Sequence, residues 1–549
     1  MTTPRSSTRW LLCLALAAAG CGRERPSSTG PLAEGLDAIP AERVAPAEYA
    51  RLAEHLAARG STALAWATAE AARRLDPSTR VNLAADRLDD PDVSMAVDKL
   101  GAVPDARALG ALAAGVESRW PSPSVGARVA LDRLVGPGST PLAGLDRPAI
   151  ARRRIARLLL EDGRPDEALT QLDDGPEADW LRARAYLNLG DEAKAAAALA
   201  RAGGYGLDAV HRPEPATYAG ALSCKGCHAS IYATQQASHH ASTIRRGPAE
   251  LVGVPLPPST LADPVVPSAS HTFSREASGI RVRAKVDGST YEALLDYAIG
   301  SGHRGTTLVG RDVDGGGRRS MRISSYKGES GPIWDVTSGF SAHPASPRDF
   351  LGKPLSAAGF RECLHCHTTR FRDAEDRTGP EADDRGIGCE RCHGPGGNHA
   401  PALAAGWPYA AIGRPKHATA EQRMSLCAPC HAADGSIPPD NPEFARFQST
   451  TLPYSRCYTE SPGKLDCTTC HDPHKNAETS VDFYTRKCLS CHDPMAKPQK
   501  PCPVEPLRDC TTCHMPRVGE GVSHTTFADH HIRARRGESG SSTAPKGRP

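Results

Sequence analysis

The sequence of 549 residues has few aromatic side chains and little net charge. Phe, Trp and Tyr make up 5% of the residues, and 66 basic against 63 acidic side chains leave a formal net charge of +3. Such a balance gives no general attraction to nucleic acid or to an anionic membrane. So few aromatics, together with 51 Gly and 47 Pro, are a poor supply for a conventional core, above all in the C-terminal half. A chain of this length is expected to form two or more domains.

Long apolar runs are missing beyond the first residues. Two arginines precede a short apolar run at residues 10–19, and residues 18–21 (Ala-Ala-Gly-Cys) resemble a lipobox. This pattern predicts a lipoprotein signal peptide over residues 1–21, lipid attached to Cys21, and a tether over residues 22–45. An ordinary secretory peptide cut near the end of the apolar run is the alternative. The sequence therefore predicts an exported protein, periplasmic or associated with the outer membrane through the lipid anchor.

Cysteine, by contrast, is abundant and follows one pattern. Most of the 18 Cys fall in seven copies of Cys-x-x-Cys-His, the attachment signal for c-type haem. In each copy, two thiols are expected to form thioethers with one porphyrin, and the His is placed to bind the iron. Zinc ribbons also use paired Cys-x-x-Cys units, but they have no reason to put His after the second Cys every time. The copies are Cys224/Cys227/His228, Cys363/Cys366/His367, Cys389/Cys392/His393, Cys427/Cys430/His431, Cys467/Cys470/His471, Cys488/Cys491/His492 and Cys510/Cys513/His514.

Seven covalently attached haem c groups would also change how this chain folds. Each porphyrin is a large flat apolar body that the polypeptide can wrap. We therefore expect haem to supply the interior of the C-terminal half, which would be largely unfolded without it.

The N-terminal part has the composition of a helical array. Residues 46–206 are rich in Ala, Leu and Arg with helical spacing of apolar positions, and two stretches resemble tetratricopeptide repeats, from Gly60 to Pro77 and from Trp180 to Ala202. An irregular Ala-rich helical array is the alternative. Stacks of helix pairs commonly bind proteins on a concave face, so this part predicts docking of a protein partner.

The remaining chain predicts a haem-packed domain over residues 207–535 and a disordered tail over residues 536–549. Residues 279–286 alternate apolar and polar side chains before Asp-Gly, which predicts a strand and turn inside a small β-rich insertion at about residues 245–350. After Cys363 the motifs are dense, and short helices and loops are expected. The predicted fold class is therefore mainly α, with a tetratricopeptide-like array followed by a multihaem domain.

Five further histidines are candidates for the sixth iron ligand. Two of them follow a motif too closely to reach its own iron, and we expect each to bind a neighbouring haem. The five candidates are His240, His399, His474, His524 and His530. His303 and His343 are weaker candidates. Two-His ligation closes iron to substrates and suits electron transfer, whereas an open sixth position makes iron a catalyst.

Three local patterns give the C-terminal half a family resemblance. They are Ser238-x-His240 after the first motif, Gly388-Cys-Glu-Arg-Cys-His-Gly-Pro-Gly396, and Cys470-His-Asp-Pro-His474. Over about residues 215–535 the chain resembles the multihaem cytochromes c related to the tetrahaem partner of hydroxylamine oxidoreductase, here joined to tetratricopeptide-like repeats. The resemblance implies closely packed, largely bis-His haems that exchange electrons with membrane or periplasmic redox proteins.

Two functions remain open from the sequence. The favoured one is electron transfer, with no catalytic residue assigned. The alternative is an oxidoreductase that acts on a small nitrogen or sulfur compound at one open haem. No Cys-x-x-Cys-Lys is present, so the lysine-ligated active haem of pentahaem nitrite reductase has no counterpart. A third possibility is a scaffold whose repeats assemble a respiratory complex.

Two cysteines remain outside the motifs and the predicted leader. Cys457 and Cys502 could form a disulfide in an oxidising compartment. The alternative is a pair of buried thiols.

Overall fold

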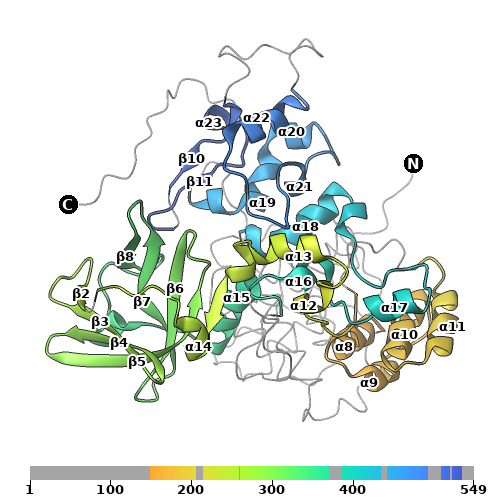
Figure 1. Ribbon diagram of the computed structural model, residues 1–549, viewed down its shortest axis with the longest axis horizontal. Coiled ribbons are helices and arrows are strands. Elements are labelled where there is room, and N and C mark those ends of the chain that lie inside the picture. The colour runs from red at the N-terminus through yellow and green to blue at the C-terminus, as the bar shows by residue number, and fades with distance from the viewer. Residues whose placement is uncertain are drawn as a thin grey trace, which may run out of the picture.

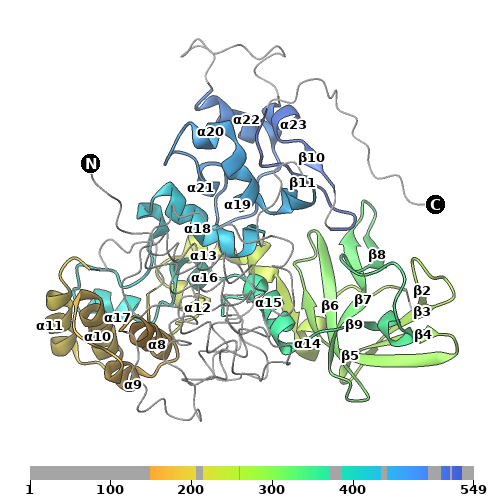
Figure 2. The ribbon, with the colours of Figure 1, turned by 180° about the vertical axis from the view of Figure 1, so that it is seen from behind.

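A computed structural model describes residues 149–205, 214–258, 260–370, 386–433, 442–492, 509–519 and 522–533. The predicted signal peptide, tether, first repeat stretch and C-terminal tail lie outside the described residues, as does Cys502. Figure 1 shows a group of N-terminal helices on one side, a sheet on the opposite side, and short helices between and above them. The same three parts separate in the view from behind (Figure 2).

Four helices form the described N-terminal part. They are α8 (Ala149–Glu161), α9 (Pro165–Thr170), α10 (Pro176–Asn188) and α11 (Glu192–Ala202). Proline in the first turn begins α9 and α10, where its missing N–H has no helical partner to lose. α10 lies at the centre, because it contacts each of the other three helices.

These helices correct the prediction of a repeat array. A repeat needs two helices of similar length that stack on the next pair. α9 has only 6 residues, whereas α8 and α10 have 13 each. Within the described residues there is consequently no clear helical-repeat array.

The chain then crosses to a single nine-stranded antiparallel sheet. Seven strands follow one another as neighbours from β2 to β8, while β1 pairs with β5 and β9 pairs with β7. The strands are β1 (Ile244–Arg246), β2 (Thr260–Ala262), β3 (Ser270–Glu276), β4 (Gly279–Val286), β5 (Ser289–Ile299), β6 (Gly305–Asp312), β7 (Arg318–Lys327), β8 (Pro332–Val336) and β9 (Gly352–Pro354).

Two long strands make the sheet curl. β5 pairs with β4 through Leu295 and then with β1 from Tyr297 onward, and a register shift separates the two halves. Along one edge of β7, the first residues pair with β9 and the later residues pair with β8. Register shifts of this kind bend a strand and increase its twist. The result is a curled sheet that forms half of a barrel (Figure 1).

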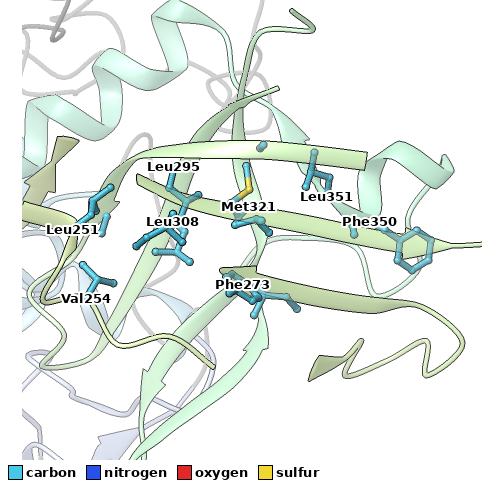
Figure 3. Close-up of a cluster of buried hydrophobic side chains, with 14 of the residues drawn as sticks. Leu251, Val254, Phe273, Leu295, Leu308, Met321, Phe350 and Leu351 are labelled. Carbon is cyan, nitrogen blue, oxygen red and sulfur yellow. The ribbon is translucent and has the colours of Figure 1, made fainter. Parts of the chain in front are cut away.

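The concave side of the sheet holds the main apolar core. Phe273, Leu295, Leu308 and Met321 are each at most 6% exposed, and α14 (Gly247–Leu251) covers one end of the core. Figure 3 shows these side chains pointing toward one another from neighbouring strands. This core is built entirely from side chains of the chain itself.

The size of this sheet overturns the mainly-α prediction. Helices make up 40% of the described part of the chain, and strands make up 20%. The alternation in β4 indicates a strand, but β6 and β7 are rich in Thr, Ser, Gly and Arg, and their apolar positions are few. Their strand character comes from cross-strand pairing, which depends on neighbours distant in sequence.

A second apolar cluster joins the sheet to the first of the following helices, α15 (Ala357–His367). Phe360 and Leu364 of α15 pack on Ile244, Tyr297 and Val309 of the sheet, and all are nearly fully buried. The rings of Tyr297 and Phe360 lie 4.8 Å apart. The sheet therefore fixes the position of α15, which carries the second Cys-x-x-Cys-His motif.

Short helices make up the rest of the described chain. Before the sheet they are α12 (Ala221–Cys224), α13 (Ala229–Gln236) and η2 (His240–Ser242). η3 (Pro347–Phe350) lies between β8 and β9. After the sheet they are α16 (Cys389–His393), α17 (His399–Ala404), η4 (Pro415–His417), α18 (Ala420–His431), η5 (Pro442–Arg446), α19 (Gln448–Thr451), η6 (Leu452–Tyr454), α20 (Arg456–Thr459), α21 (Cys467–Cys470), α22 (Val481–Leu489) and α23 (Cys510–His514). One small ribbon closes this part, in which β10 (Arg517–Val518) pairs with β11 (Phe527–Ala528).

Candidate haem-attachment site

Every motif lies on or beside a short helix. One helical turn separates the two cysteines of a motif, so both thiols lie on the same side of the helix. In five of the motif helices the N-cap side chain accepts a hydrogen bond from a backbone N–H of the first turn, which starts the helix at a fixed residue. These caps are Ser356, Thr419, Asp466, Ser480 and Asp509.

The motif helices contact one another in a continuous series. α12 of the first motif contacts α16 of the third, and α15 of the second contacts α18 of the fourth. From α18 the series continues through α21 and α22 to α23 of the seventh motif. Arg391 links the third motif to the fourth, because its Nη2 lies 3.9 Å from the Cys430 sulfur. All seven motifs thus belong to one connected group.

A buried carboxylate ties the first motif to the third. Glu390 is 5% exposed and accepts hydrogen bonds from the backbone N–H groups of Ala219, Gly220 and Gly396 at 2.6–2.8 Å. Burial raises the pKa of Glu390, while these three donors act in the opposite direction. Glu390 belongs to the third motif, and it positions the backbone of Ala219 and Gly220, which directly precedes the helix of the first motif.

Three candidate sixth ligands lie beside the histidine of a motif other than their own. Two imidazoles that share one metal on opposite sides, each at about 2 Å, would have ring centres about 6 Å apart. Each observed pair joins segments that are distant in sequence. The pairs are His240 with His431 at 6.2 Å, His393 with His474 at 6.3 Å, and His471 with His530 at 6.3 Å.

The Nδ1 atom of five of these six histidines has a hydrogen-bond partner. The acceptors at Nδ1 of His393 and His530 are backbone carbonyls, at 2.9 Å each. A carbonyl only accepts, so Nδ1 carries the proton and Nε2 keeps the lone pair that a metal requires. The side-chain oxygens of Gln448 at His431 and of Asp472 at His474 accept in the same way, at 3.2 Å each. The hydroxyl of Tyr484 lies 3.4 Å from Nδ1 of His471.

Burial also favours the neutral form of these rings. It lowers the pKa of His393 and His471, and it lowers the pKa of His530 to about 4. An imidazole must be neutral to donate its lone pair to iron, so these rings are in the binding form at neutral pH.

Some of the predicted haem-binding side chains are exposed. They are Cys227 and His228 of the first motif, His431 of the fourth, Cys491 and His492 of the sixth, and Cys513 of the seventh. The reason is local. No side chain of α12 or α23 is buried, and in α22 only Thr485 is. The polypeptide therefore does not enclose these positions by itself.

This exposure does not exclude attachment. Thioether formation needs accessible thiols, and a porphyrin bound there would cover part of the exposed surface. His228 still lies within the motif group, since it is close enough to His393 to lower the pKa of that residue. The assignment of these exposed side chains to haem, like that of the other motif residues, rests on their motifs and stays a prediction.

The two other candidate ligands have different surroundings. His399 donates from Nδ1 to the carbonyl of Ala410 at 2.6 Å and lies close enough to His393 to lower the pKa of that residue. His524 is directed at the sheet, where its Nε2 lies 2.7 Å from a carboxylate oxygen of Asp335 in β8. The structure thus places His399 within the motif group and His524 at its border with the sheet.

Two further histidines, the weaker candidate His303 and His271 of β3, lie in or beside the sheet. His303 stacks on His239 with ring centres 4.0 Å apart, a separation that leaves no room for a metal between the rings. His271 is a core residue of the sheet, because its Nε2 lies 2.9 Å from the buried carboxylate of Asp263.

The arrangement of donors fits haem better than a bare metal. Structural zinc needs four ligands that converge on one point. Within the described residues, no three His, Cys, Asp or Glu side chains gather in that way. Haem iron needs only two protein ligands on opposite sides, and the three histidine pairs have the corresponding separation.

The sulfur atoms are not joined in disulfides. Neither the 14 motif cysteines nor Cys457 forms a disulfide among the described residues. Burial raises the pKa of the Cys457 thiol, and the nearby Cys491 adds to the effect. Because Cys502 is not described, the predicted disulfide stays a prediction.

Sequence reasoning missed most groups that orient the ligands. Asp472, next to His471, is part of a pattern the sequence displays. Gln448 and Tyr484 carry no local signal, because each reaches its histidine only through the packing of a separate helix.

The comparisons with known proteins agree with this chemistry. The family described as "Cytochrome c554 and c-prime" matches residues 350–394, which include the second and third motifs. The chain is also similar to the multiheme cytochrome MtrA of Shewanella baltica (strain OS185), with 24% identity over 187 residues. That match covers 31% of this chain, and the chain spans about half (49%) of the length of the relative. No solved structure matches.

These matches and the donor geometry support one class of protein: a multihaem c-type cytochrome with covalently bound haem c. Homology to such cytochromes indicates electron transfer as its general role. No described helix has the length and apolar character needed to cross a membrane.

Proposed function

We propose that this protein is an exported heptahaem c-type cytochrome that conducts electrons through closely packed, mostly bis-His haems. The observation that carries the proposal is that contacts between motif helices, together with the Arg391 side chain between the third and fourth motifs, connect all seven motifs, with three histidine pairs inside the group. When bound, haem c supplies a one-electron Fe(III)/Fe(II) couple. A connected group of such couples forms a path through the protein.

The residues of the chain have three tasks in this proposal. The cysteine pairs fix each porphyrin to its helix. The histidine pairs fill both axial positions and keep iron low-spin and closed to substrates. The hydrogen bonds at Nδ1 hold each ring in the orientation and tautomer that iron needs.

The contacts also support an order of the haems along the proposed electron path. The contacts lead from the third motif through the fourth, fifth and sixth to the seventh, whose helix α23 lies at the top of Figure 1, away from the N-terminal helices. We propose that one redox partner docks near the first and third motifs, where the helical part is adjacent, and that the other docks near the seventh. The exposed motif side chains Cys227, His228 and Cys513 at these two ends would let a bound haem edge face a partner. The lipid anchor at Cys21 would hold the protein at a membrane in the exported compartment.

The number and state of the haems test this proposal. We expect seven irons and seven haems per purified protein, and an oxidised electron paramagnetic resonance spectrum dominated by low-spin iron. The protein should not change its spectrum with carbon monoxide, nitrite or hydroxylamine. A stoichiometric high-spin signal that responds to these ligands would favour the alternative, an oxidoreductase with one open haem. Colourless or zinc-loaded protein would overturn both.

A further inference from the structure

One short segment holds two of the candidate ligands at once. In segment 407–413, the carbonyl of Ala410 accepts from Nδ1 of His399 at 2.6 Å, and that of Gly413 accepts from Nδ1 of His393 at 2.9 Å. The N–H of Gly413 also donates to the carbonyl of His393 at 2.8 Å. The position of this segment therefore sets the orientation of both rings.

The segment has a conformation that its own sequence does not favour. Ala411 lies between the two carbonyls, is fully buried, and has φ of 51°. A non-glycine residue in this left-handed region costs about 1 kcal/mol, so surrounding contacts must hold it in place. The question is which contacts do so.

The helical part provides them through a buried charged cluster. Arg184 of α10 forms an ion pair with Glu214, and both side chains are 0% exposed. The hydroxyl of Tyr409 donates to Glu214 at 3.2 Å. The Arg184 guanidinium also lies over the rings of Trp180, Trp407 and Tyr409, with its central carbon 4.6–5.0 Å from the ring centres. Segment 407–413 is thus anchored at its start by a cation held among three aromatic rings.

We propose that Arg184, Glu214 and Tyr409 are positioning residues for the haem ligands His393 and His399. The proposal rests on the proposed function, because it assigns these histidines to haem iron. A strong hydrogen bond at Nδ1 makes an imidazole a better donor to iron and favours the oxidised state. Loosening the cluster is therefore expected to raise the reduction potential of the haems that these rings bind. The helical part would then adjust the reduction potential of these haems as well as offer a surface for a partner.

Two variants of the full-length holoprotein test this inference. Tyr409→Phe removes one hydroxyl and leaves the ring in the cage. Arg184→Met combined with Glu214→Gln removes both buried charges together, so neither is left unpaired. The matched control is Arg182→Ala on the same helix, since Arg182 bonds Asp179 and the carbonyls of Leu172 and Asp173, all within the helical part.

The readouts are haem content, low-spin resonance signals and haem potentials. We expect unchanged haem content, a shift of one or two low-spin signals, and a roughly three- to tenfold change in the reduction equilibrium of the same haems toward Fe(II), as expected for loss of about one hydrogen bond. The shifted signals should be those that also change in His399→Ala or His474→Ala. The control should leave every signal in place.

The outcomes separate the two proposals. If the wild-type protein does not contain seven haems, the proposed function itself is contradicted. Wild-type protein with seven haems, but with all signals and potentials unchanged in Tyr409→Phe and in any double variant that folds, would overturn the positioning role alone.

Discussion

The sheet and the C-terminal motif region are held together in different ways. The sheet buries a contiguous apolar cluster of its own side chains, including Phe273, Leu295 and Met321. Among the described residues after Leu452, which carry the fifth, sixth and seventh motifs, no hydrophobic side chain is buried. Polar residues such as Asp466 and Thr485 are buried there instead. The sheet therefore forms its core from its own apolar side chains, while the C-terminal motif region depends on a bound cofactor to supply a core.

The largest expected effect comes from withholding haem. We predict that protein made without haem attachment keeps the sheet but loses ordered structure in the described residues after Leu452, because these residues bury no hydrophobic side chain that could replace the porphyrins. Hydrogen exchange measured by mass spectrometry should show protected amides in β4 and β5, and near-complete loss of protection in α21, α22 and α23. Equal protection of both regions without haem would contradict the comparison.

A smaller effect is expected from the buried charges of the sheet. Asp263 accepts from Nε of Arg322 at 2.5 Å and from Nη2 at 2.9 Å. Its other partners are Nε2 of His271 at 2.9 Å and the backbone N–H groups of Val265 and Val266 at 3.1 and 3.0 Å. We predict that Asp263→Asn lowers the free energy of unfolding of the sheet by about 3 kcal/mol at pH 7, because it leaves a buried guanidinium without its counter-charge. The haem signals of the fifth to seventh motifs should not change.

The same residue gives a pH dependence with a definite sign. Burial by itself raises the pKa of Asp263, but hydrogen bonds from Arg322 and His271 lower it below its usual value. A lowered pKa stabilises the fold above the unfolded value of about 3.9, and that stabilisation is lost as the pH falls through the folded pKa. The difference between wild type and Asp263→Asn should therefore shrink below about pH 4. Asp314→Asn, which removes an exposed carboxylate paired with Arg348, is the matched control and should have little effect.

The smallest effect is expected where the two regions meet. Asp335 of the sheet and His524 of the C-terminal region are each 32% exposed, so their ion pair contributes less than about 1 kcal/mol. We predict that Asp335→Asn speeds hydrogen exchange in β11 by at most about fivefold and leaves every low-spin signal unchanged. Loss of one low-spin signal in His524→Ala would show instead that His524 binds iron.

The local part of the site could be predicted from sequence. A thiol pair one helical turn apart with an adjacent histidine is a short-range pattern, and Ser, Thr or Asp at the N-caps sets the motif helices. The curled sheet could be predicted in its place in the chain, as a β-rich insertion at about residues 245–350, and as an individual strand at β4, where alternation is regular. Its other long strands depend on partners, and the size of the sheet made the mainly-α prediction wrong. The same limit applies to the predicted repeats, because the short α9 shows its length only in the fold.

Exposure within the motifs was also beyond the reach of the sequence. His228 and His492 follow the same local pattern as His393 and His471, yet the first two are exposed and the second two are largely enclosed. The pattern fixes only which atoms lie together on one helical turn. How much of each motif is covered depends on which other segments pack against it.

The sequence by itself determined the chemistry available to this protein: seven thiol pairs, each with a histidine beside it, and too few apolar residues to enclose the C-terminal region. Only the tertiary structure decided which histidines face one another and which groups orient them. His240 meets His431 and His474 meets His393 because helices from distant parts of the chain pack together. Attachment depends on atoms a few residues apart, whereas ligand pairing and the orienting contacts from Arg184 depend on contacts that form only when the whole chain has folded.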